Sequence, residues 1–83
     1  KSKNLILISV DTSDLKESFS IEEALKQIVG FNNVKIKELR EKNTIYEINS
    51  IYSVKHINFG LESKNLKLIK TDMDKNLFSV ESY

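Results

Sequence analysis

The chain has 83 residues and a mass of 9.6 kDa, and 40% of its residues are hydrophobic, which predicts a single small domain over residues 1–83 with one core. It contains no cysteine, so disulfide bonds, cysteine-ligated metal centres and a thiol nucleophile are excluded. Thirteen Lys and Arg residues against twelve Asp and Glu residues give a net charge of +1, without the positive excess typical of proteins that bind a nucleic-acid backbone.

The composition and the first residue indicate the setting of the chain. Twelve Lys, ten Ile and eight Asn residues, whose codons are rich in A and T, make up 30 of the 83 residues, a bias typical of a low-G+C bacterium or its phage. The sequence begins at Lys1 rather than at methionine, so we expect an excised or mature fragment of a longer protein. No apolar run approaches the ~20 residues that span a bilayer, so we expect no membrane span in this fragment.

The first predicted element is a strand. Residues 5–10 form an almost continuous run of branched apolar side chains, which predicts a strand inside the sheet with both faces covered. The turn-forming side chains from Asp11 to Asp14 then predict a loop that extends through Phe19.

One helix is expected next. Ser20 followed three residues later by Glu23 has the pattern of a capping box, so the helix is expected to begin there. Apolar residues then recur at helical spacing, and Gly30 is typical of the left-handed residue that ends a helix. This helix of about ten residues is expected to cover one face of the sheet.

Two hairpins are predicted in the rest of the chain. Residues 34–37 alternate apolar and Lys side chains, and residues 44–48 resume in strand-forming residues after Asn43, which we expect at a turn position with positive φ. The same pattern recurs in residues 66–70 and 77–80, with Asn76 in the turn between them.

Residues 51–60 fit either a strand or a helix, and we favour a strand because of their Tyr, Val and Ile content. The fold class is then α+β, with one main helix packed on an antiparallel sheet of four to five strands, as in cystatin-like domains. If residues 51–60 form a helix instead, the order of elements becomes that of a ferredoxin-like βαββαβ sandwich.

The sequence offers no converging set of catalytic groups. His56 is the only histidine, and we expect it to be a surface or packed residue. The acidic pattern at Asp72 and Asp74 lacks the glycine and the closing glutamate of a calcium loop, so we interpret it as a hairpin turn. With only Gly30 and Gly60, a glycine-rich phosphate loop is excluded. We therefore expect no enzyme activity, no cofactor and no catalytic, cofactor-binding or metal-binding residues.

The lysines on the predicted strands indicate contact with another protein. We expect Lys35 and Lys37 on the exposed face of their strand, where lysines also protect a sheet edge from pairing. Together with Tyr46 and Tyr52 they form the candidate partner-binding surface. Our first hypothesis is a non-enzymatic protein-binding, inhibitory or regulatory module that uses strand addition. The alternatives are a small nucleic-acid-binding or phage-type regulatory protein, and a structural domain of a larger envelope or secretion assembly.

A family resemblance follows from three segments: the helix start Ser20-Ile21-Glu22-Glu23-Ala24-Leu25-Lys26, the strand Thr44-Ile45-Tyr46-Glu47-Ile48, and the hairpin of residues 69–72 and 76–81. Through them residues 20–82 resemble the PepSY domain, although that family usually has glycine where Asn76 stands. The resemblance implies a cystatin-like helix wrapped by an antiparallel sheet, a place outside the cytoplasm or in the cell envelope, and a role in inhibiting or regulating peptidases. Without the resemblance, we expect a cytoplasmic protein.

Overall fold

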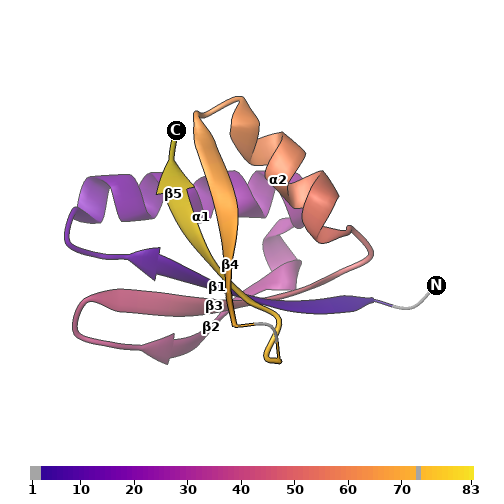
Figure 1. Cartoon of the computed structure of the whole chain (residues 1–83), viewed down its shortest axis with the longest axis horizontal. Coiled ribbons are helices and arrows are strands. Elements are labelled where there is room, and N and C mark those ends of the chain that lie inside the picture. Colours follow the sequence, from indigo (N-terminus) through magenta and orange to yellow (C-terminus); the bar gives the residue numbers. More distant parts are fainter. Residues whose placement is uncertain (1–2, 73) are drawn as a thin grey trace.

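Two helices pack on one five-stranded sheet in the computed structural model, which describes residues 3–72 and 74–83 (Figure 1). The fold is therefore α+β, as the sequence predicts, but it contains a second helix and a mixed sheet. In chain order the elements are β1 (Asn4–Asp11), α1 (Leu15–Val29), the short 3₁₀ helix η1 (Phe31–Asn33), β2 (Val34–Leu39), β3 (Asn43–Ser50), α2 (Val54–Glu62), β4 (Leu66–Asp72) and β5 (Leu77–Ser82).

The first strand of the chain lies at the centre of the sheet, whose order is β2-β3-β1-β5-β4. β1 runs antiparallel to β3 and parallel to β5, so the expectation of a purely antiparallel sheet is wrong. The reason is the second helix. The crossover through α2 leaves β4 pointing in the same direction as β3, and the final hairpin then brings β5 back parallel to β1.

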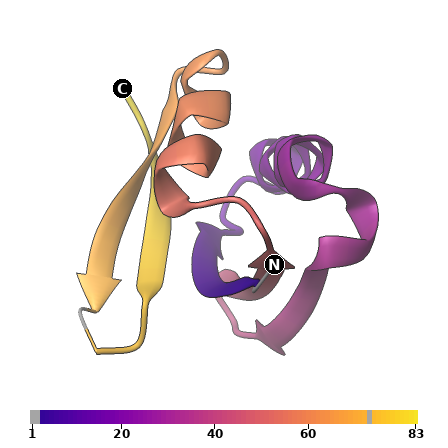
Figure 2. The same ribbon diagram turned by 90° about the vertical axis from the view of Figure 1, so that its right-hand side faces the viewer.

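The sheet is covered on one face only. Both helices lie on the same face of the sheet (Figure 2). Ile6, Ile8 and Val10 of β1 point to this face, and each is at most 1% exposed. Leu5 points to the other face and is 53% exposed, and Leu7 is partly exposed. The expectation that both faces of β1 are covered is therefore wrong, although its place inside the sheet is confirmed. We call the uncovered side the open face.

α1 begins six residues earlier than the sequence pattern indicates. The carboxylate of Asp14 accepts hydrogen bonds from the backbone N–H groups of Lys16 at 3.0 Å and Glu17 at 3.2 Å, so Asp14 is the N-cap. Ser20 lies inside the helix, and the predicted loop through Phe19 is wrong because an earlier cap satisfies the first turn. Gly30 ends the helix with φ 102°, as expected.

Residues 54–62 form a helix, so the preference for a strand over residues 51–60 is wrong. The Ser53 side chain accepts a hydrogen bond from the backbone N–H of His56 at 3.2 Å and thereby caps the first turn. Ile57 and Leu61, four residues apart, are fully buried on the side of α2 that faces the core. The order of elements is the ferredoxin-like alternative with one further strand, rather than the one-helix arrangement.

Both hairpins form as predicted, but one of their turns differs. Asn76 has φ 53°, as expected, while the other non-glycine residue with positive φ in the described part of the chain is Asn65, at 60°. Asn43 is instead the first residue of β3, and its side-chain amide donates to the Ser9 hydroxyl at 2.6 Å. Its amide therefore links two strands, and the predicted positive φ at this position is wrong.

The two helices approach each other closely at Gly60. A Cβ atom at this position would lie 2.8 Å from Cγ1 and from Cδ1 of Ile28 on α1, which is closer than carbon atoms pack. The glycine therefore allows α2 to lie against α1 while both helices remain on the sheet.

We expect Gly60→Ala to destabilise the fold by about 1–2 kcal/mol, because the clash with Ile28 outweighs the gain in helix propensity. Urea unfolding followed by circular dichroism measures the change. In an Ile28→Ala background, where the clash is removed, the same substitution is expected to be neutral or stabilising. An equal cost of Gly60→Ala in both backgrounds would contradict this account of the helix contact.

Candidate binding surface

The structure separates the four residues of the candidate partner-binding surface. Lys35 and Lys37 are exposed on the open face at β2, the position expected for them. Tyr46 points to the opposite face and is only 4% exposed, and Tyr52 lies between β3 and α2, where it packs against the core. Strand alternation explains the position of Tyr46, because it faces the helices whereas its neighbour Glu47 is cross-strand partner to Lys35 on the open face.

Tyr46 connects the sheet to α1. Its hydroxyl donates a hydrogen bond of 2.7 Å to one carboxylate oxygen of Glu22, and the ammonium of Lys26 lies 2.8 Å from the other. The same ammonium lies 4.7 Å from the centre of the Phe31 ring. The hydrogen bonds from Lys26 and Tyr46 lower the pKa of Glu22, while burial and the Glu22 carboxylate raise the pKa of Tyr46. Tyr46 is therefore a structural residue, and we remove it from the candidate surface.

Tyr52 belongs to the start of α2. Its ring stacks on the His56 imidazole, with ring centres 4.3 Å apart and planes inclined by 13°. Its backbone carbonyl accepts a hydrogen bond of 3.1 Å from the side chain of Asn4, which joins this segment to β1. Neither contact places Tyr52 beside Lys35 or Lys37, so Tyr52 is also removed from that surface.

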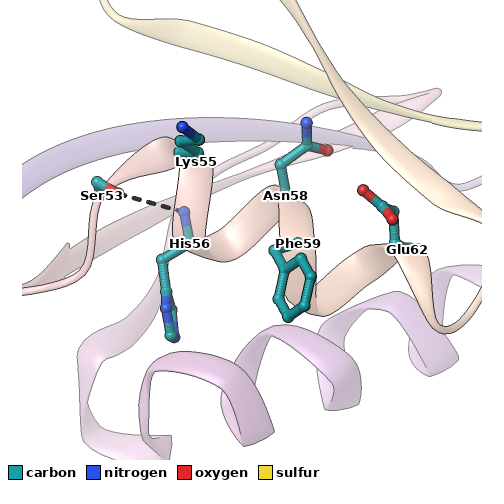
Figure 3. A pocket seen from close by; sticks show the side chains of 6 residues that line it. All are labelled: Ser53, Lys55, His56, Asn58, Phe59 and Glu62. Carbon is teal, nitrogen blue, oxygen red and sulfur yellow. Dashed lines mark hydrogen bonds between the residues drawn. The ribbon is translucent and has the colours of Figure 1, made fainter.

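A groove of about 510 Å³ runs along the exposed side of α2 (Figure 3). His56 and Phe59 extend to the side on which α1 is seen, whereas Lys55 and Asn58 extend away from it (Figure 3). Phe59 is 74% exposed, and the groove contains no pair of groups arranged for acid–base or nucleophilic chemistry. Its lining residues are Ser53, Lys55, His56, Asn58, Phe59 and Glu62.

The open face of the sheet has two neighbouring depressions on the side of β2. The first, which we call the cationic basin, has a volume of about 160 Å³, with an apolar floor and charged side chains around it. The second, which we call the edge depression, has a volume of about 120 Å³ and a polar lining. The basin is lined by Leu7, Ile45, Leu77, Lys37, Glu38, Arg40 and Lys75, and the edge depression by Lys3, Asn32, Asn33, Lys35, Glu47 and Asn49.

Positive charge gathers in these two depressions. Together they contain five cationic side chains and two carboxylates, a surplus of three, whereas the whole chain has a net charge of +1. Arg40 pairs with Glu38, and the Lys37 ammonium lies 3.9 Å from Glu47. Within residues 3–72 and 74–83, no carboxylate lies within ion-pair distance of the Lys35 ammonium. Because the whole chain has a net charge of +1 and the two depressions together have a net charge of +3, the remainder of the chain has a net charge of −2.

The acidic side chains of the described part of the chain do not gather into a metal-binding cluster. Residues 3–72 and 74–83 contain no group of three or more His, Cys, Asp or Glu side chains that could hold a metal ion. The Asp72 carboxylate accepts hydrogen bonds from the backbone N–H groups of Asp74 at 3.0 Å and Lys75 at 3.3 Å, the geometry of a turn.

None of the helices within residues 3–72 and 74–83 has the length and apolar character needed to cross a membrane.

Comparison with known proteins adds no family assignment. No protein-family model matches the chain, and no curated protein and no solved structure matches it at a significant level. The resemblance to the PepSY domain therefore stays a prediction.

Apart from Lys37, the sequence pattern did not reveal the residues that build the basin. Leu7 lies within an apolar run that is typical of a strand covered on both faces, so nothing local indicates that its side chain faces solvent. Leu77 and Lys75 reach the basin because β5 pairs in parallel with β1, with Leu77 beside Leu7. That pairing joins residues about seventy positions apart, and no local signal specifies it.

We expect Tyr46→Phe to lower the free energy of unfolding by about 1–2 kcal/mol at neutral pH, because the hydroxyl donates to a charged acceptor. The folded-state pKa of Glu22 is below its ordinary value of 4.5, so the stability it contributes is complete above that value and is lost as the pH falls through the folded-state pKa. The difference in the free energy of unfolding between the wild type and Tyr46→Phe should therefore become smaller at acidic pH.

Urea unfolding between neutral pH and about pH 3 measures this dependence. Tyr52→Phe is the control, because the Tyr52 hydroxyl has no hydrogen-bond partner in the described chain. A deficit for Tyr46→Phe that is the same at every pH would refute the proposed role of the Glu22 interaction.

Proposed function

We propose that this chain is a non-enzymatic protein-binding module, inhibitory or regulatory in role, which binds an extended segment of its partner along β2. The observation that carries the proposal is that β2 is an edge strand with five of its six residues exposed, next to an uncovered sheet face. Exposed strand edges bind peptides by main-chain hydrogen bonds, and the side chains of alternate residues supply specificity.

The two edges of the sheet differ in a way that supports β2 as the binding edge. At the opposite edge, the backbone N–H of Leu68 on β4 donates to the side-chain oxygen of Asn58 on α2 at 3.0 Å. This N–H points away from β5, the only neighbour of β4 in the sheet, and Asn58 occupies the place that a further strand would take. α2 therefore protects the β4 edge (Figure 1).

The β2 edge has no such protection over its first half. Among the described residues, none outside β3 donates a hydrogen bond to, or accepts one from, the backbone of Val34–Leu39. The pairing of β2 with β3 shifts register between Ile36 and Glu38, where a bulge interrupts the regular edge. Residues 34–36 therefore remain as a short docking segment, and the bulge limits unspecific pairing between copies of the chain.

The other two hypotheses have less support. The cationic basin and the edge depression contain no aromatic side chain on which a base could stack, which disfavours single-stranded nucleic acid. A structural domain of a larger assembly would use the same surface, and it would differ from a regulatory module only in that its partner stays bound permanently. If the PepSY resemblance holds, the partner is a peptidase, whose inhibition by an extended contact fits strand addition.

Selection of binding peptides from a displayed library of random sequences of about twelve residues, followed by NMR mapping on the ¹⁵N-labelled chain, tests the proposal. We expect selected peptides to shift the backbone amide signals of residues 34–36 and to show intermolecular contacts with β2. Phe59→Ser in the α2 groove is the control and should leave their affinity unchanged. Peptides that map to α2, or no peptide that binds more tightly than about 100 μM, would count against the proposal.

We also expect Asn58→Ala to expose the β4 edge. The Leu68 amide should exchange its hydrogen faster, and the chain should self-associate at high concentration, because an unprotected edge is free to pair. Asn58→Asp retains an acceptor oxygen and is the matched control, in which slow exchange should persist. Hydrogen exchange by NMR and sedimentation velocity measure the two effects, and equal exchange at Leu68 in Asn58→Ala and the wild type would refute the edge cap.

A further inference from the structure

The open face carries one continuous row of side chains that begins at the β2 edge. In the register of the sheet, Lys35 lies opposite Glu47, Glu47 opposite Leu7, and Leu7 beside Leu77. Lys37 lies on the same face of β2 and reaches Glu47 at 3.9 Å. A strand added to β2 would therefore have two lysines beside it on the open face, with the cationic basin behind them.

The opposite face of β2 presents an apolar side chain between these two lysines. Ile36 alternates with Lys35 and Lys37, and it is 54% exposed although it is cross-strand partner to the buried Tyr46. Lys37 stands at the bulge, and its contact with Glu47 places it on the same face as Lys35, while side chains of neighbouring strands pair on the same face. A strand that complements β2 would accordingly have an acidic side chain beside each of Lys35 and Lys37, and an apolar side chain between them beside Ile36.

The volume of the cationic basin also limits the class of ligand. About 160 Å³ is well below the range of about 300–1,000 Å³ that is typical of cofactor and small-molecule pockets. The floor of Leu7, Ile45 and Leu77 and the rim of Lys37, Lys75 and the Arg40–Glu38 ion pair fit a single side chain of mixed character. The basin therefore suits part of a peptide better than a separate small molecule.

A second copy of the chain is a poor occupant of this edge. Antiparallel pairing of two β2 strands about Ile36 would place Lys35 of each copy opposite Lys37 of the other, and like charges directly opposite each other destabilise a strand pair. An acidic strand reverses the sign of that interaction. The surplus of three positive charges around the two depressions would also steer such a strand toward β2.

From these observations we infer that the segment bound along β2 is an acidic extended peptide in which carboxylate side chains alternate with apolar ones. The inference rests on the proposed function, since it names the chemistry of the partner at the same edge. The carboxylates lie beside Lys35 and Lys37 on the open face, and the intervening apolar side chain packs on Ile36.

Fluorescence anisotropy with three labelled peptides of about twelve residues tests the inference. Their central segments are Glu-Val-Glu-Val-Glu, the neutral Gln-Val-Gln-Val-Gln and the basic Lys-Val-Lys-Val-Lys. We expect the acidic peptide to bind at least about tenfold more tightly than the other two at about 25 mM salt, and to lose most of that advantage at about 250 mM salt, where charges are screened.

Two variants locate the site. Lys35→Gln/Lys37→Gln is expected to weaken binding of the acidic peptide about fivefold to tenfold, in keeping with the loss of two exposed ion pairs. Lys55→Gln on α2 removes one positive charge from the other side of the molecule and should leave the affinity unchanged. Lys75→Gln, in the β4–β5 turn and outside the β2 strand, should have an intermediate effect, and it remains informative if the double variant fails to fold.

The outcomes distinguish the inference from the proposed function. If the neutral or basic peptide shifts the amide signals of residues 34–36 as strongly as the acidic one, the acidic preference is wrong and strand addition at β2 stands. If no peptide perturbs these amides, both are wrong. Tighter binding of an oligothymidine of about twelve nucleotides than of the acidic peptide would also overturn the inference and favour nucleic acid.

Discussion

Burial of β1 at the centre of the sheet is the interaction on which the rest of the fold depends. Its side chains Ile6, Ile8 and Val10 are at most 1% exposed and belong to the same buried core as the inward-facing residues of both helices. Burial of side chains of this size contributes roughly 1.5–3 kcal/mol each, a large share of what stabilises a domain of this length. β1 also joins the two hairpins, because β3 pairs on one side of it and β5 on the other.

The parallel contact between β1 and β5 is short and is reinforced at one end. It spans residues 7–9 of β1, and the turn before β5 adds two hydrogen bonds, from the Leu7 N–H to the Asn76 carbonyl and from the Asn76 side chain to the Leu5 carbonyl. Asn76 reaches these groups with φ 53°, a conformation that asparagine tolerates better than most residues. The same residue therefore shapes the hairpin and fastens it to the central strand, which brings Lys75 and Leu77 to the cationic basin.

Because both helices cover the same face, the fold leaves one face and two edges of the sheet to be protected by side chains. The β4 edge is protected by Asn58, and the second half of β2 by its bulge. Residues 34–36 and the neighbouring cationic surface remain, and the proposed binding of an acidic strand uses them. The lysines then have two compatible effects, since they discourage pairing between copies and favour a partner of opposite charge.

The sequence alone determined the features that depend on neighbouring residues: the strand over residues 5–10, the two hairpins, the helix end at Gly30, the turn at Asn76 and the exposure of Lys35 and Lys37. It placed the start of the first helix at Ser20 instead of Asp14 and favoured a strand over residues 51–60, because the competing local preferences differ by about 1 kcal/mol or less. Only the tertiary structure decided that residues 54–62 form a helix, through burial of Ile57 and Leu61 on the core side of α2 and the close approach of Gly60 to Ile28. It alone also placed Tyr46 in the core and assembled the basin, because the pairing of β5 with β1 joins residues that are distant in the chain.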